Sequence, residues 1–375
     1  MFMRGGTSKA AMFLAADLPA DPEERDRLIL ALYGSPDPAG LQLNGIGGGT
    51  SSTSKAAVIS PSGDSRADVD YLFLQVGIDK AEVDTTGNCG NISAAVGPFA
   101  IDKGLVQATG TLTRVRIRNV NTDTIIVAHV PTRDGAFDPR GDFAIPGVPG
   151  TGSAIRLDFE APAGAVTGAL LPSGAVLDEL TVSWGTVHVS IVDAANPVVF
   201  VRAEDLGLRG GETREERNAP EVRARAAEIR AHGAVRAGMI RHVDDAPSTP
   251  AVPRVAVVTA PRDYRTAGGE LVAADQVDVV AAMYSMGAAH AAYPFTGAIA
   301  TAVAAQLAGS VVHEVARPTA GVFRIGHPGG VQELEAVVRR QDDGTWHVER
   351  VSSYRTARAI MGGELIVPPS YSPRS

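Results

Sequence analysis

The most distinctive stretch of this sequence is Gly87-Asn88-Cys89-Gly90-Asn91, and the small, apolar run Ile92-Ser93-Ala94-Ala95-Val96 follows it. Glycine and asparagine favour tight turns, so the pattern predicts a turn that opens a helix. Cys89 is the only cysteine in 375 residues, and the start of a helix favours a thiolate because free N–H groups and the helix dipole face it. The same N–H groups can bind a carboxylate. The alternative interpretation is a small buried cysteine in a structural turn.

Length and composition limit the classes of protein that this chain can be. With 375 residues, of which 45% are hydrophobic and 20% charged, it fits a globular protein of two domains. A net charge of −8 without a basic stripe excludes nucleic acid as a partner, so any anion site must be local. The single cysteine excludes an intrachain disulfide and a cysteine-based zinc site, and it fits a reducing cytoplasm. No apolar stretch approaches the roughly 20 residues that span a membrane.

The N-terminal part of the sequence predicts a strand, a turn and a helix. Residues 1–4 look like the end of a strand, so we expect a few residues to precede Met1 in the natural chain. The apolar run 10–16 is too short for a signal peptide. Asp21 followed by Pro22 predicts the start of a helix, and Gly34 predicts its end.

Proline and glycine cluster in residues 162–174, which predicts a linker between two domains. We assign residues 1–175 to an N-terminal domain, with residues 353–375 as a C-terminal strand that can return to it. Residues 176–352 form the C-terminal domain. Apolar runs predict helices at 274–286 and 296–307, and the last strand is expected at 364–367.

One internal similarity suggests two related halves. Residues 12–18 resemble residues 199–206, and each segment precedes, at a distance, a turn and a helix of small residues. The second of these turns is Tyr293-Pro294-Phe295-Thr296-Gly297. Two such halves, each directing a helix N-terminus at a common cleft, would suit a substrate with two or more carboxylates.

A set of motifs along the chain resembles the PrpF family, which includes 2-methylaconitate isomerases and 4-oxalomesaconate tautomerases. An ordered set of motifs over almost the whole chain is far more specific than any single motif. The matching segments are residues 3–9, 45–48, 53–55, 68–73, 88–91, 96–101, 229–233, 290, 296–298 and 326–330.

The resemblance implies an α+β fold of two pseudo-symmetric diaminopimelate-epimerase-like domains, each a curved, mostly antiparallel sheet around a central helix. It also implies a cofactor-independent isomerase, without a metal, that moves a double bond or changes its geometry in an unsaturated di- or tricarboxylate. The expected substrate is of the 2-methylaconitate or aconitate type. The catalytic lysine and cysteine of the family correspond to Lys55 and Cys89.

The chemistry of such a reaction assigns roles to these residues. A neutral Lys55 would remove a proton from carbon, and Cys89 would act as the acid or second base at the other allylic carbon. Backbone N–H groups at the two helix starts would stabilise the enolate. The residues expected to bind substrate are Thr7, Ser8, Thr53, Ser54, Asn88, Gly90, Asn91, His290, Thr296, Gly297 and Ala298.

Two positions depart from the family pattern, and the substrate stays open. Pro294 stands where the two-thiol epimerases of this fold have a second cysteine, which argues against a racemase. Ala282, in the helix predicted at 274–286, stands where the family often has arginine, so one carboxylate contact would be lost. Residues 51–55 and 229–233 look closest to the methylaconitate isomerases. His290 and residues 296–298 look more like the 4-oxalomesaconate tautomerases, which are the alternative assignment.

Two other classes of protein also stay open. One is a cysteine hydrolase with Cys89 as its nucleophile, although no histidine motif lies near the thiol in the sequence. The other is a carboxylate-binding paralogue that has lost catalysis. The expected partner is a small anionic polycarboxylate, and a homodimer is one alternative for the oligomeric state.

Overall fold

The chain divides into two compact units in the computed structural model, which describes residues 1–249, 251–369 and 371–372. The first unit comprises Met1–Asp158 together with the chain from Tyr354 onward, and the second comprises Phe159–Ser353. The first unit is therefore built from both ends of the sequence. No helix among the described residues is long and apolar enough to cross a lipid bilayer.

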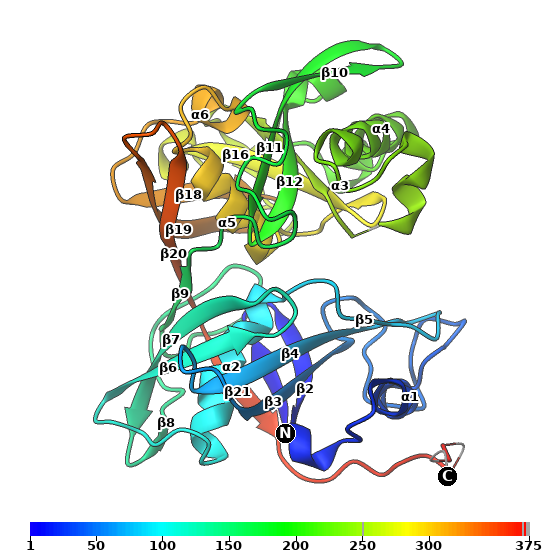
Figure 1. Ribbon diagram of the computed structural model, residues 1–375, viewed down its shortest axis with the longest axis vertical. Helices are drawn as coiled ribbons and strands as arrows, with labels where there is room; N and C mark the ends of the chain where they lie inside the picture. The colour runs from blue at the N-terminus through cyan, green and yellow to red at the C-terminus, as the bar shows by residue number, and fades with distance from the viewer. Residues whose placement is uncertain (250, 370, 373–375) are drawn as a thin grey trace. The chain divides into compact units, whose positions relative to one another are not determined.

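The first unit is a curved sheet around helix α2 (Gly90–Asp102), which is buried over almost its whole length (Figure 1). The main strands, in sheet order, are β21 (Ala357–Met361), β1 (Phe2–Gly5), β2 (Ser8–Leu14), β3 (Lys55–Pro61), β4 (Val69–Val76), β6 (Leu112–Asn119), β7 (Thr124–Arg133) and β9 (Ile155–Glu160), whose last two residues belong to the second unit. Strands β2–β3 and β4–β6 pair in parallel, whereas β21–β1, β1–β2, β3–β4 and β6–β7 are antiparallel. Strand β5 (Val83–Asp84) pairs with β4, and β8 (Ala136–Phe137) pairs with β7.

Helix α1 (Pro22–Tyr33) covers the face of this sheet that is opposite α2. The Asp21 side chain accepts a hydrogen bond from the N–H of Glu24 at 2.9 Å, and Gly34 ends the helix at φ 70°. These are the start and stop that the sequence predicts. The apolar face of α1 packs against alternate residues of the strands, among them Ala11, Ala56, Val58, Leu74 and Val76.

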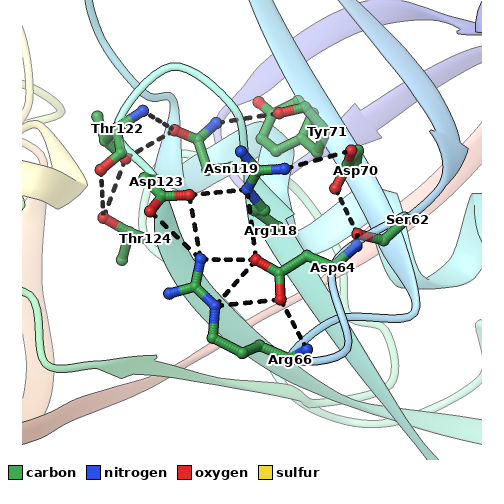
Figure 2. A network of polar contacts seen from close by, with 10 residues as sticks. All are labelled: Ser62, Asp64, Arg66, Asp70, Tyr71, Arg118, Asn119, Thr122, Asp123 and Thr124. Atoms are coloured by element: carbon green, nitrogen blue, oxygen red, sulfur yellow. Dashed lines mark hydrogen bonds and ion pairs between the residues drawn. The ribbon is translucent and has the colours of Figure 1, made fainter.

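Exposed charged side chains tie the turn between β6 and β7 to the loop before β4 (Figure 2). Arg66 Nη2 lies 2.7 Å from Asp64 Oδ2 and 3.3 Å from Asp123. Arg118 Nε donates to Asp123 Oδ1 at 2.7 Å. The side-chain hydrogen bond from Arg66 lowers the pKa of Asp64 to about 2. Because water surrounds these groups, we expect the network to fix the turn with only a small effect on stability.

The second unit has its own curved sheet around helix α5 (Phe295–Ala304), which is fully buried. The main strands, in sheet order, are β10 (Asp178–Val182), β11 (Gly185–Ala194), β12 (Asn196–Arg202), β13 (Arg254–Thr259), β16 (Val279–Ser285), β18 (Val322–His327), β19 (Gly330–Arg340) and β20 (Trp346–Arg355), whose last two residues belong to the first unit. Strand β17 (Ala288–Ala289) pairs with β16, while β14 (Tyr264–Arg265) and β15 (Leu271–Val272) form a separate ribbon. The outer helices are α3 (Arg214–Arg217), α4 (Pro220–Arg236) and α6 (Val311–Val315).

The two units repeat one arrangement of strands. In the second unit β12–β13 and β16–β18 are the parallel pairs, at the same places in the order as β2–β3 and β4–β6. The internal similarity of the sequence lies in this repeat. Strand β2 runs into the 3-10 helix η1 (Ala15–Asp17), and β12 runs into η2 (Ala203–Leu206). The predicted fold of two pseudo-symmetric domains around central helices is thereby confirmed.

The repeat extends to one ion pair in each unit. Asp68 accepts the backbone N–H of Arg116 at 2.8 Å and its guanidinium at 2.6 Å. Asp278 accepts the backbone N–H of Arg324 at 2.8 Å and its guanidinium at 2.8 Å. The Asp68 side chain is 28% exposed and that of Asp278 is 2% exposed. Each pair fixes the strand before the parallel crossover, so this part of the scaffold is duplicated.

Two predicted elements are wrong. Residues 274–286 are not a helix: a short 3-10 turn, η4 (Ala274–Gln276), precedes strand β16. Strand β16 lies between β13 and β18, and successive side chains on both of its faces are buried, so apolar residues fill nearly every position. Such a run does not differ in periodicity from a buried helix. The strand expected at 364–367 is also absent, and the last strand among the described residues is β21.

The boundary between the units lies before the Pro- and Gly-rich segment 162–174, and not after it. The backbone of this segment bonds to the end of β11. Gly164 N donates to Asp193 O at 2.8 Å, Asp193 N donates to Leu170 O at 2.9 Å, and Ala195 N donates to Pro162 O at 2.7 Å. The segment is therefore part of the second unit. Composition alone does not distinguish such a folded loop from a linker.

Candidate active site

Two glycines bring the first hairpin of the chain against the start of α2. A Cβ at Gly5 would lie 2.5 Å from Asn91 O, and one at Gly6 would lie 2.1 Å from Asn91 Oδ1. Gly6 also has a φ of +50°, which disfavours other residues. The Asn91 amide donates to Thr7 Oγ1 at 3.1 Å, and Ser8 is buried at the start of β2. The predicted residues Thr7 and Asn91 are thus brought together and held.

Cys89 is the N-cap residue of α2 and has an extended backbone, with φ −114° and ψ 93°. Its thiol is free and half-buried. Its carbonyl accepts the N–H of Ser93 at 3.0 Å, and the Ser93 hydroxyl lies 3.5 Å from Oδ1 of the buried Asn88. The N–H groups of Gly90 and Asn91 donate to no other residue within the part of the chain that is described. The helix start therefore presents open donors beside the thiol, as predicted.

Lys55 opens β3 directly opposite Gln75 of β4, and it is only 8% exposed. Its Nζ donates to Gln75 Oε1 at 2.5 Å and lies 5.0 Å from the centre of the Phe73 ring. The Gln75 amide N–H in turn donates to Ser54 O at 2.9 Å. The hydroxyl of Tyr33 donates to the Lys55 carbonyl. A surface lysine would lack these contacts. The Lys55 side chain is therefore fixed in one position by its neighbours.

The loop before Lys55 is organised by one glutamine. Gln42 Oε1 accepts the Ser54 hydroxyl at 2.5 Å and the N–H of Gly49 at 2.9 Å. Ser54 is fully buried, so its hydroxyl supports the loop. Thr53 is half-buried and its hydroxyl lies 2.7 Å from that of Thr50. Of the two predicted binding residues, Thr53 has the more accessible hydroxyl.

Lys55 and the start of α2 lie on the same face of the first sheet. Side chains alternate along a strand, so Tyr71, Phe73 and Gln75 point to one side of β4. Phe73 and Gln75 contact Lys55. Tyr71 lies at the start of α2, where burial and then the nearby Cys89 hold the pKa of its phenol well above the usual value. The amine and the thiol are therefore both on the α2 side of the sheet.

The start of α5 repeats this arrangement, with a proline in place of the cysteine at the N-cap. Its N-cap residue is Pro294. The N–H groups of Thr296 and Gly297 donate to no other described residue, whereas that of Ala298 donates to Pro294 O at 2.9 Å. A Cβ at Gly297 would lie 2.4 Å from the Met283 side chain, so glycine allows α5 to pack on β16. Thr296 and Gly297 are thus the open donors, while the Ala298 amide is used within the helix.

Arg254 brings a cation to the start of α5. It lies opposite Val198 at the start of β13, as Lys55 lies opposite Ala10 at the start of β3. Its Nη1 donates to Thr296 Oγ1 at 2.7 Å. Arginine stays charged in proteins, so this residue can bind a carboxylate but cannot act as a base.

His290 is half-buried and follows β17. Its backbone N–H donates to Met283 O at 2.8 Å, and its Nδ1 accepts the N–H of Ala292 at 3.1 Å. Because Nδ1 is an acceptor, the neutral ring carries its proton on Nε2. His290 can therefore offer an N–H donor a few residues before α5.

Ala282 lies elsewhere than predicted. It is in strand β16 and not in a helix, and it pairs with Val257 of β13. The neighbouring Met283 contacts α5 at Gly297, so Ala282 points to the opposite face. An arginine at this position would not reach the start of α5. The presence of alanine therefore removes no carboxylate ligand from the start of that helix.

Sequence reasoning missed Gln75 and Arg254. Gln75 is a polar residue among the apolar residues of its strand, which is a weak signal for a site. Arg254 begins an apolar strand, and only the internal repeat places it in the position of Lys55. Both assignments depend on strand register, which the sequence does not provide.

Comparison with known proteins relates this site to one family. The sequence model of the family described as PrpF protein matches residues 1–368. The 3-methylitaconate isomerase of Eubacterium barkeri is 44% identical, the 2-methyl-aconitate isomerase of Shewanella oneidensis 41%, and the (4E)-oxalomesaconate Delta-isomerase of a Novosphingobium strain 41%. Each alignment covers 98% of this chain and 96% of the relative.

Solved structures agree with the sequence comparison. The crystal structure of a methylitaconate-delta-isomerase has a TM-score of 0.85 and 42% identity, and it covers 100% of this chain and 98% of its own. A probable proline racemase from Agrobacterium radiobacter has a TM-score of 0.55 at 12% identity, covering 99% and 94%, which shows a shared fold. The chain therefore belongs to the PrpF family and, like its named relatives, it is an isomerase.

Proposed function

We propose that the protein is a cofactor-independent isomerase of an unsaturated di- or tricarboxylate of the 2-methylaconitate or aconitate type. It would act by allylic proton transfer or by cis–trans isomerisation. The observation that supports this proposal is the position of Lys55 and Cys89 on one face of the first sheet, with the open N–H groups of α2 next to Cys89. An amine and a thiol so placed can exchange protons with two carbons of one allyl system.

In the proposed reaction, neutral Lys55 removes a proton from an allylic carbon. The electron pair moves into the conjugated carboxylate and forms an enolate, which the N–H groups of Gly90 and Asn91 stabilise. The Cys89 thiol then delivers a proton two carbons away, so the double bond shifts and the substrate keeps its number of protons. A proton passes from the Lys55 ammonium to the Cys89 thiolate, through solvent, before the next cycle. Rotation about the weakened bond before reprotonation would give the cis–trans product instead.

Each unit has its own groups that can bind a carboxylate. In the first unit these are Thr7, Thr53, Asn88 and Asn91, with Ser8 and Ser54 supporting the turn and the loop. In the second unit they are Arg254, His290 and the N–H groups of Thr296 and Gly297, with Ala298 continuing the helix. Arginine and helix N-termini are the usual carboxylate ligands of proteins.

The alternative substrate is 4-oxalomesaconate. The observation that favours it as a second candidate is the 41% identity to the (4E)-oxalomesaconate Delta-isomerase, which equals the identity to a 2-methyl-aconitate isomerase. The relative at 44% is named for 3-methylitaconate, a dicarboxylate, so smaller acids also belong in the test. The further alternative is a carboxylate-binding paralogue without turnover.

Proton NMR in D2O tests these proposals with one purified sample. The protein is incubated in turn with cis-aconitate, 2-methylaconitate, 3-methylitaconate and 4-oxalomesaconate, and Lys55→Ala is the control. We expect a new isomer with deuterium at an allylic carbon for one acid, and neither with Lys55→Ala. Binding of an acid without exchange or product would refute the isomerase proposal and favour the paralogue. Equal turnover by Lys55→Ala would show that the base is a different group.

We also propose a small anionic polycarboxylate as the partner and a cytoplasmic location, which a single reduced cysteine favours. Sedimentation at several protein concentrations would decide between a monomer and a homodimer.

A further inference from the structure

We propose that Gln75 is a positioning residue that holds the Lys55 amine for proton transfer without favouring its charged form. This inference rests on the proposed function, because it concerns the base of that reaction. Gln75 Oε1 accepts the hydrogen bond of Lys55 Nζ at 2.5 Å. The two residues face each other directly across β3 and β4, so the contact depends on the register of the sheet.

The amide of Gln75 is itself fixed in one orientation. Its N–H group donates to Ser54 O at 2.9 Å and to Ser51 O at 3.3 Å. Both partners are carbonyl oxygens, so the nitrogen must face them and the oxygen must face Lys55. The loop 51–54 therefore determines where the acceptor for the lysine amine lies.

The chemistry of the partner matters as much as its position. Gln75 and Phe73, two partners of Nζ in this unit, carry no charge. An amide oxygen accepts a hydrogen bond from an amine as well as from an ammonium group. A carboxylate at the same place would stabilise the ammonium and raise its pKa. Because a general base must be neutral before it accepts a proton, glutamine fits this role and glutamate does not.

Other titratable groups of the first unit contact the Lys55 backbone or lie on the same face of the sheet. Asp84 pairs with Gln75 and lies on this face, where its carboxylate accepts the Thr86 hydroxyl at 2.6 Å. Burial raises the pKa of Tyr33 and of Tyr71, so both stay neutral near pH 7. The Cys89 thiol lies on the same face, so the measurement uses a variant without it. Lys9 is next to Ala10, the β2 partner of Lys55, and points to the other face of that strand.

The sequence makes a direct measurement possible. The chain contains only four lysines, Lys9, Lys55, Lys80 and Lys103, so lysine labelled with 13C at Cε gives four resonances. The signal of Lys55 is assigned from Lys55→Met. Its titration is followed in a Cys89→Ala background with Gln75, Gln75→Glu or Gln75→Leu, and this needs no substrate. Thermal unfolding verifies that each variant is folded, because Gln75→Glu would place a carboxylate beside Ser54 O.

We expect Gln75→Glu to raise the Lys55 pKa by about one to two units and to move the acidic limb of the pH–rate profile upward by the same amount. In the Cys89-containing enzyme, kcat/KM near pH 7 would then fall about 10- to 100-fold. Gln75→Leu removes the acceptor at similar size, so we expect kcat to fall about 10-fold or more without an upward shift of the limb. If Gln75 had a merely structural role, Gln75→Glu would lower the unfolding temperature without moving the acidic limb of the pH–rate profile.

The proposal is overturned if the Lys55 pKa is the same with Gln75 and with Gln75→Glu. It is also overturned if Gln75→Leu, once folded, keeps kcat within about twofold. If the unsubstituted protein turns over none of the acids while Gln75→Glu still raises the Lys55 pKa, the proposed function fails and the control of Lys55 by Gln75 is supported.

Discussion

The starts of helices α2 and α5 occupy equivalent places in two sheets of the same strand order, yet their chemistry differs. The first has Cys89 at its N-cap and the second has Pro294. Lys55 opens the strand at the first, and Arg254 opens the equivalent strand at the second. Both starts offer open N–H groups, and a side chain of the first turn (Asn91 or Thr296) is bonded to a neighbouring strand or turn.

This difference indicates a division of roles between the halves. Lysine and cysteine can lose and gain protons near neutral pH when their surroundings allow it, whereas arginine and proline cannot. The scaffold is repeated in both units, down to the Asp68–Arg116 and Asp278–Arg324 pairs. We infer that the start of α2 is suited to proton transfer and that the start of α5 is suited to binding an anion.

The largest expected effect is that of Lys55→Met. Removing the base should lower kcat about 10²- to 10⁴-fold and change KM much less. Steady-state kinetics with the acid identified in D2O measures both constants. The matched control is Lys80→Met, because Lys80 is exposed in a turn of the same unit. Full turnover by Lys55→Met, or an equal loss by Lys80→Met, would contradict the division of roles.

The next effect is that of Arg254→Met. Loss of a charge-assisted hydrogen bond to a carboxylate should raise KM about 10- to 100-fold while kcat changes little. Arg254→Lys keeps the charge and should recover part of the loss. If Arg254→Met lowered kcat at unchanged KM, the second half would take part in the chemistry, and the comparison of the two helix starts would need revision.

A third prediction compares the duplicated ion pairs. Asp278→Ala should lower the free energy of unfolding by about 2–4 kcal/mol, because a buried carboxylate that holds both backbone and side chain of Arg324 is lost. Asp68→Ala should cost only about 1–2 kcal/mol, since Asp68 is more exposed. Urea denaturation measures both. Equal losses would show that the exposure of the carboxylate does not set the strength of this contact.

The smallest effect concerns the turn between β6 and β7. The folded-state pKa of Asp64 is lowered to about 2, so its contribution to stability is present above the ordinary pKa of about 4 and is lost as the pH falls through about 2. Asp64→Asn should lower the unfolding temperature slightly at about pH 5 and much less at about pH 2. At the equivalent turn between β18 and β19, the Nδ1 atom of His327 instead accepts the N–H of Gly329 at 3.0 Å. An Asp64→Asn effect that did not change with pH would refute the role of this carboxylate.

Local signals in the sequence predicted much of the fold and part of the site. Asp21, Pro22 and Gly34 mark the ends of α1 because capping depends on neighbouring residues only. The turn at Cys89 opens α2 for the same reason. Resemblance to the family identified Lys55 and Cys89 as the catalytic candidates.

Features that depend on register and burial could not be predicted in this way. The sequence predicts a helix in place of strand β16, because a strand that is buried on both faces has no polar side. Gln75 lies 20 residues from Lys55, and their contact exists only because β3 and β4 pair in one register. To place Arg254 at the start of α5, the register of the strands in the second sheet must also be known. Gln75 and Arg254 are therefore the main residues that the structure adds to the predicted site.

The return of the C-terminal strand to the first unit has a consequence for synthesis on the ribosome. Strand β1 pairs with β21, and both Gly6 N and Arg4 donate to the carbonyl of Thr356. The whole second unit, Phe159–Ser353, is translated before these partners exist. The glycine turn against α2 therefore receives its last contacts only near the end of translation, so the half of the protein that begins to be made first is the half that is completed last.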